Sequence, residues 1–205
     1  MSSEAEEALV TTMKRVAATL KAADIPFALA GSFAVYALGG STSDHDVDFL
    51  IREQDAAKAL EALAAEGFRT ERPPEDWLVK VYDEDRLVDL IHRPVERPVT
   101  DDTLADTTVL SVHAVRMPVL SATALMEHKL LTFCQHYCDF ARALPMARSL
   151  REQIDWPRVW RETRHSPYAE AFFLLLDRLD VVRQPRDDKP GRAGGAGPGR
   201  VREAA

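Results

Sequence analysis

The spacing of hydrophobic and polar residues changes near residue 120 of the chain. Up to that point, short apolar runs alternate with stretches in which apolar residues recur at helical spacing. This pattern predicts helices at residues 3–23, 33–38 and 55–66, and strands at residues 27–30, 47–51, 68–70, 77–82, 87–92 and, as one strand or a strand pair, 109–120. Beyond residue 120 the pattern is helical, with predicted helices at residues 121–137, 139–151 and 155–164 and from residue 166 onward.

The chain therefore divides into three predicted parts. Residues 1–120 form a core of strands and helices, and residues 121–183 form a helical C-terminal region. Residues 184–205 contain three Pro and five Gly with almost nothing apolar. Such a segment cannot bury enough surface to offset its ordering entropy, so we expect a disordered tail.

Composition and charge narrow the class of protein. The 205 residues include 26 Lys and Arg against 33 Asp and Glu, a formal net charge of −7. This balance argues against broad contact with phosphate backbones, although bound divalent cations could still bring polyanions to an acidic surface. No stretch approaches the roughly 18 consecutive apolar residues of a membrane helix. Because the acidic N-terminus also lacks the features of a signal peptide, we expect a cytoplasmic protein without membrane contact.

Three carboxylates spaced two residues apart carry the most specific chemical signal. Asp44, Asp46 and Asp48 would share one face of a strand, because alternate residues of a strand point the same way. Val47 and the apolar residues 49–51 mark that strand as buried. Adjacent buried carboxylates repel each other, and a bound divalent cation would relieve that repulsion. Hard oxygen ligands select Mg²⁺ or Mn²⁺.

Two further features surround this strand. Gly31 and Ser32 lie between a predicted strand and a predicted helix, where backbone N–H groups and a hydroxyl could bind a phosphate. Asp89 lies within the apolar strand segment 88–91 and could supply a third carboxylate. A cage of this kind binds two metal ions that clamp the attacking and leaving oxygens of a phosphoryl transfer.

These motifs together resemble the polymerase-β-type nucleotidyltransferase superfamily. The resemblance rests on Gly31-Ser32, the thirteen residues between Ser32 and Asp46, the alternation of Asp46 and Asp48 with apolar residues, and the later acid Asp89. The short chain and a predicted helix that contains Lys129 are most similar to small bacterial members, among them antibiotic nucleotidyltransferases and abortive-infection-type toxin nucleotidyltransferases. The resemblance implies an α+β core, a mixed sheet of five strands or fewer with helices on one side, followed by a C-terminal helical region.

The resemblance also implies roles for single residues. The Gly31-Ser32 pair would hold the triphosphate, and Lys129 would face the nucleotide phosphates. Asp46 and Asp48 would bind the metal ions, with Asp89 as the third ligand or as the group that activates the acceptor hydroxyl. Asp44 with Asp46 is a competing metal pair at a plausible spacing, but the apolar residues after Asp46 favour Asp46 with Asp48.

The implied activity is the Mg²⁺- or Mn²⁺-dependent transfer of a nucleoside monophosphate from an NTP to an acceptor, usually a hydroxyl, with release of pyrophosphate. The acidic chain favours a small-molecule acceptor, such as a cationic one, over a tRNA. Two alternatives stay open: a nucleotide-binding or partner-binding module of the same fold without catalysis, and a component of a toxin–antitoxin or defence pair that acts through a partner.

Two other groups of residues have simpler interpretations. Cys134 and Cys138 would share one face of a helix, and without a second pair of ligands they are better interpreted as buried cysteines than as a zinc site. Two tryptophans and two phenylalanines recur at helical spacing and are expected in the core: Trp156, Trp160, Phe172 and Phe173.

Overall fold

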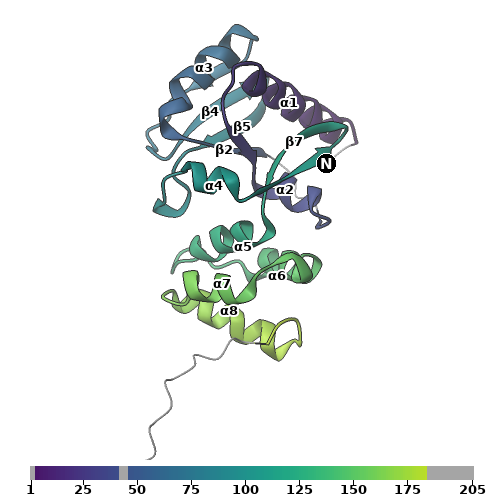
Figure 1. The fold of residues 1–205 in the computed structure, drawn as a ribbon, viewed down its shortest axis with the longest axis vertical. Coiled ribbons are helices and arrows are strands. Elements are labelled where there is room, and N and C mark those ends of the chain that lie inside the picture. Colours follow the sequence, from purple (N-terminus) through teal and green to yellow (C-terminus); the bar gives the residue numbers. More distant parts are fainter. Residues whose placement is uncertain (1–2, 42–45, 184–205) are drawn as a thin grey trace, which may run out of the picture.

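The computed structural model describes residues 3–41 and 46–183. The predicted tail and Asp44 lie outside these residues. The described part has the α+β architecture expected from the sequence, with a mixed sheet followed by a stack of helices (Figure 1). None of the described helices is long and apolar enough to cross a membrane.

The sheet has seven strands in the order β3-β4-β5-β2-β1-β7-β6, so the expectation of five strands or fewer is wrong. The smaller sheet was implied by the resemblance alone, since every strand lies in or overlaps a segment that the hydrophobic pattern predicted. β3 adds an edge strand to β4, and residues 107–120 fold as a hairpin of two strands. The strands are β1 (Phe27–Leu29), β2 (Asp46–Ile51), β3 (Arg69–Glu71), β4 (Leu78–Asp83), β5 (Arg86–Ile91), β6 (Thr107–Val112) and β7 (Val115–Leu120).

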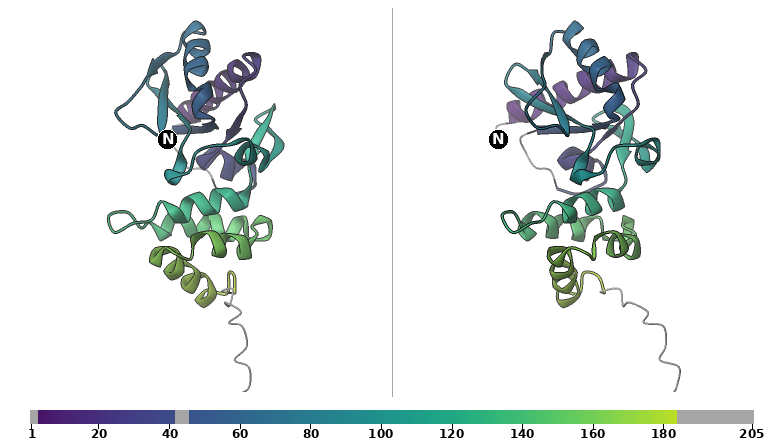
Figure 2. Two further views of the ribbon diagram at one scale, coloured as in Figure 1. Left: turned by 60° about the vertical axis from the view of Figure 1, so that its left-hand side comes forward. Right: turned by 90° about the vertical axis from the view of Figure 1, so that its left-hand side faces the viewer.

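Helices cover both faces of this sheet, which corrects the expectation of helices on one side. α1 (Ser3–Ala22) and α3 (Ala56–Ala65) pack together on the face to which Val47 and Phe49 point, both fully buried. α2 (Gly31–Ala37) lies on the opposite side, where it contacts β2, β6 and β7 (Figure 2). A short helix that the sequence pattern did not predict, α4 (Asp101–Ala105), begins with a capping box between Thr100 and Thr103.

The helical region lies beneath the α2 side of the sheet (Figure 1). It comprises α5 (Ala122–Leu131), α6 (Phe140–Ser149), α7 (Trp156–Thr163) and α8 (Pro167–Arg178). The side chain at each N-cap accepts a backbone N–H of the first turn; the caps are Ser121, Asp139, Asp155 and Ser166. The aromatic residues expected in the core pack there, and the Trp160 and Phe173 rings meet edge to face with centroids 5.1 Å apart.

The helix that begins after Ser121 ends earlier than expected. It stops at Leu131, and Cys134 and Tyr137 then exchange backbone hydrogen bonds across a tight turn. Cys134 and Cys138 are therefore exposed and lie outside any helix, so the interpretation as buried helix cysteines is wrong. The turn brings the Tyr137 side chain into the cavity described below.

Candidate active site

Strand register brings three carboxylates together. β2 and β5 are parallel, and Asp48 lies directly opposite Asp89 in their pairing. Asp46 lies two residues before Asp48 and therefore on the same face. Each of the three side chains offers an oxygen within 4.8 Å of the others. The three acids that the sequence singled out thus form one cluster at the centre of the sheet.

The turn into α2 is shaped to fit this cluster. The Ala30 N–H donates to the Asp48 carbonyl oxygen at 2.8 Å, which ties the end of β1 to β2. Gly31 follows with φ of +57°, and a Cβ atom at this position would overlap the Asp48 carboxylate. A left-handed backbone and a close neighbour both require glycine here. Glycine thus lets α2 begin in contact with the acidic cluster.

The cluster carries strong electrostatic repulsion. Burial, together with the charges of Asp46 and Asp89, raises the pKa of Asp48 to about 7. Burial also raises the pKa of Asp89, although a neighbouring Lys80 opposes that effect. Three convergent carboxylate oxygens in a half-buried site are the donor set that a hard divalent cation prefers. The residues present therefore fit a Mg²⁺ or Mn²⁺ ion, which would relieve the repulsion.

Ser32 lies beside the cluster in the first turn of α2. Its Oγ is buried and has no hydrogen-bond partner among the residues that the structure describes. A buried hydroxyl without a partner is uncommon, because its desolvation is not compensated. An oxygen-rich ligand at the cavity rim could supply that missing partner.

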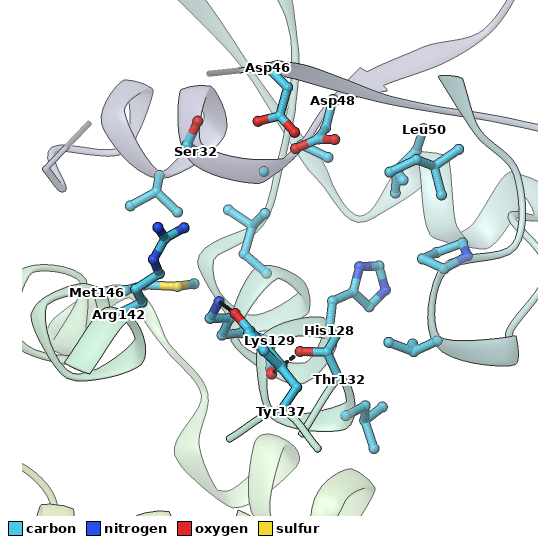
Figure 3. Close-up of a pocket in the computed structure, with 18 of the residues that line it drawn as sticks. Ser32, Asp46, Asp48, Leu50, His128, Lys129, Thr132, Tyr137, Arg142 and Met146 are labelled. Carbon is cyan, nitrogen blue, oxygen red and sulfur yellow. Dashed lines mark hydrogen bonds between the residues drawn. The ribbon is translucent and has the colours of Figure 1, made fainter. Parts of the chain in front are cut away.

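A cavity of about 940 Å³ opens in front of the carboxylates, between the sheet face and helices α5 and α6 (Figure 3). Gly31, Ser32, Asp46 and Asp48 line one side of it. Asp89 is more deeply buried behind them, with 8% of its surface exposed. Lys129 lines the opposite side, so the cavity contains five of the six residues that the sequence predicted.

Lys129 differs from the other cations of this cavity. Its Nζ donates to the Tyr137 hydroxyl at 3.2 Å, and no carboxylate within the described part of the chain pairs with it. Arg93 and Arg142 also line the cavity, but they pair with Asp76 and Asp139. Of these three cations, Lys129 is therefore the one without a carboxylate partner among the described residues.

Several residues of the site were not predicted as site residues. Arg142 and Tyr137 come from the helical region, and no local pattern in the sequence predicts how that region packs against the sheet. His128, on α5, also lines the cavity, and burial lowers its pKa to about 4, so its imidazole is neutral at pH 7. Lys80 pairs with Asp89 across two strands, a contact that depends on strand register. The competing metal pair with Asp44 lies outside the described residues.

Comparison with known proteins decides the family. A model of a family described as uncharacterised nucleotidyltransferases matches residues 1–181. The chain belongs to this nucleotidyltransferase family. No match to a curated protein is found.

Solved structures agree with the nucleotidyltransferase fold. The antibiotic-resistance factor ANT(2'')-Ia is 13% identical, with a TM-score of 0.56 over 83% of this chain and 96% of that chain. A structure of ANT(2'')-Ia in complex with adenylyl-2''-tobramycin has a TM-score of 0.56, with 13% identity over 80% of this chain and 98% of that one. A nucleotidyltransferase-like protein from Paracoccidioides brasiliensis is 18% identical, with a TM-score of 0.53 over 83% and 88% of the two chains. At these identities the likeness concerns the fold.

The raised pKa of Asp48 makes a prediction for this nucleotidyltransferase in the absence of metal. The folded state binds the Asp48 proton up to about pH 7, whereas the unfolded state releases it near the ordinary value of 3.8. The free energy of unfolding should therefore fall between those pH values, by at most about 1.4 kcal/mol per pH unit. Chemical denaturation of wild type and Asp48→Asn across pH 4–8 (roughly the window between the two values) measures this. We expect the variant to gain stability relative to wild type as pH rises; parallel curves would contradict the raised pKa.

Gly31→Ala should disturb the site as well as the backbone. The left-handed conformation costs an alanine about 1–2 kcal/mol, and the added methyl group must displace the Asp48 carboxylate. Gly67→Ala is a matched control, since Gly67 has φ of +87° and open space around a Cβ atom. Gly31→Ala should lose at least as much stability as Gly67→Ala in thermal denaturation, and only Gly31→Ala should lose Mn²⁺ binding in a titration. Equal Mn²⁺ affinity in the two variants would refute the role of Gly31 in shaping the cluster.

Proposed function

We propose that this nucleotidyltransferase moves a nucleoside monophosphate from an NTP to an acceptor hydroxyl and releases pyrophosphate. One observation carries the proposal: Asp46, Asp48 and Asp89 converge beside the turn at Gly31, on a cavity whose opposite side holds Lys129. Carboxylates for metal ions and a separate cation for phosphates are the two parts that such a transfer needs.

Each residue has a proposed task. Asp46 and Asp48 hold Mg²⁺ or Mn²⁺, with Asp89 as a third carboxylate. The cation, when bound, would neutralise charge on the phosphate oxygens and so favour in-line displacement. The backbone at Gly31 and the Ser32 hydroxyl hold phosphate oxygens from the α2 side, and Lys129 holds them from α5.

Asp89 also has a proposed part in moving a proton. A carboxylate beside the acceptor can take the proton of the hydroxyl as its oxygen attacks the α-phosphorus atom. The bond between the α-phosphorus and the bridging oxygen then breaks, and pyrophosphate leaves with that electron pair. Most of the rate enhancement would come from positioning and from charge neutralisation.

The acceptor is proposed to be a small molecule rather than a tRNA. The cavity of about 940 Å³ falls within the size range of small-molecule sites. The formal charge of −7 disfavours an extended nucleic-acid surface. The ANT(2'')-Ia complex with adenylyl-2''-tobramycin is a case of the same fold with an adenylylated antibiotic.

Thermal denaturation with each of the four common NTPs, with and without Mg²⁺, tests the proposal. A ligand at about 100 times its dissociation constant should add about 2.7 kcal/mol to the free energy of unfolding. We expect this gain for wild type only when Mg²⁺ is present, and no gain for Asp46→Asn/Asp48→Asn. Asp85→Asn/Asp102→Asn removes two exposed carboxylates remote from the cavity lining and is the matched control, expected to behave as wild type.

Two outcomes would count against the proposal. The absence of Mg²⁺-dependent stabilisation by any NTP in a folded wild-type protein would contradict nucleotide binding at this site. Stabilisation without pyrophosphate release, measured against a panel of hydroxyl acceptors that includes aminoglycosides, would instead favour a non-catalytic binding module.

A further inference from the structure

Lys80 belongs to a row of charged residues that crosses three strands. β4 and β5 are antiparallel, and Lys80 lies directly opposite Asp89. β5 and β2 are parallel, and Asp89 lies directly opposite Asp48. Directly opposed residues in a sheet point to the same face, so a lysine, an aspartate and a second aspartate stand side by side.

The contact between Lys80 and Asp89 is close and partly shielded from solvent. The Lys80 Nζ lies 3.2 Å from Asp89 Oδ1, and the two side chains are 21% and 12% exposed. Of the ion pairs within the described residues, this is the one that reaches any of the three clustered carboxylates. A cation of the protein itself therefore already partly neutralises the site.

Asp89 Oδ1 accepts a hydrogen bond from Lys80 Nζ, and the Asp89 carboxylate also offers an oxygen within 4.8 Å of oxygens of Asp46 and Asp48. A bound metal ion and the Lys80 ammonium group would thus compete for the same carboxylate. The competition would be strong because charges in a shielded site interact through a lower effective dielectric than in water.

We propose that Lys80 is a positioning residue that competes with the bound divalent cation for the Asp89 carboxylate. By donating to Asp89 Oδ1, Lys80 fixes the orientation of that carboxylate and partly neutralises its charge. Lys80 thereby lowers the affinity of the three-carboxylate cluster for its cation. The inference rests on the proposed function and adds to it a residue that positions Asp89.

A titration with Mn²⁺ alone, followed by the electron paramagnetic resonance signal of the free ion, tests this competition. Lys80→Met removes the ammonium group but retains much of the aliphatic stem. We expect it to bind Mn²⁺ about tenfold more tightly than wild type. Lys80→Arg retains the charge and should stay within about twofold of wild type. Lys58→Met changes the net charge equally at an exposed position on α3 and should leave the affinity unchanged.

A double-mutant cycle shows whether Lys80 acts through Asp89. In an Asp89→Asn background, Lys80→Met should change the Mn²⁺ affinity by less than about twofold, because the carboxylate for which Lys80 and the cation compete has been removed. Equal tightening in both backgrounds would mean a general charge effect and would overturn the proposal, as would unchanged or weaker binding by Lys80→Met in a protein that thermal denaturation shows to be folded.

The same titration separates this inference from the proposed function. If wild type binds Mn²⁺ no better than Asp46→Asn/Asp48→Asn does, the metal site itself is refuted and the role of Lys80 with it. If wild type binds Mn²⁺ and the double variant does not, the metal site stands, and the Lys80 variants alone then decide the inference.

Discussion

Repulsion among three carboxylates on two adjacent parallel strands is the constraint on which the rest of the site depends. The register of β2 and β5 sets Asp48 opposite Asp89 with Asp46 beside them, and burial with mutual repulsion raises the pKa of Asp48 to about 7. Such an arrangement is costly for a fold unless something compensates it. The protein supplies part of that compensation through Lys80, and the donor set suits a divalent cation for the rest.

The helical region completes the site by placing cations across the cavity from the acids. α5 carries Lys129, and the link between α5, α7 and the sheet is itself ionic. Arg158 on α7 contacts the Glu127 carboxylate on α5 at 2.9 Å and the Asp106 carboxylate beside β6 at 2.8 Å. Burial raises the pKa of Glu127, and Arg158 opposes the rise, so this arginine partly offsets the cost of burying that carboxylate. The position of Lys129 therefore depends on contacts that the sheet and the helices make together.

Local sequence patterns predicted that Asp46 and Asp48 share one face of a strand, that the chain turns at Gly31, and that capped helices follow residue 120. They could not predict features that depend on pairing between distant segments. The hydrophobic pattern predicted a strand at residues 68–70, but it could not show that β3 pairs with β4 in the same sheet, so the sheet is larger than the resemblance implied. No sequence pattern distinguishes Lys80 from the other lysines, and its contact with the site follows only from its register opposite Asp89. Cys134 was misplaced because a turn, stabilised by two backbone hydrogen bonds with Tyr137, interrupts an otherwise helical pattern.

The central claim is that Asp46 and Asp48 hold a divalent cation in front of the cavity. Anomalous X-ray diffraction from crystals grown with Mn²⁺ and a non-hydrolysable NTP analogue tests it most directly. We expect a manganese peak at coordination distance from both carboxylates, with phosphate oxygens of the nucleotide on its cavity side. A well-ordered nucleotide with manganese bound only elsewhere, and with Asp46 and Asp48 in contact with no metal ion, would contradict the account.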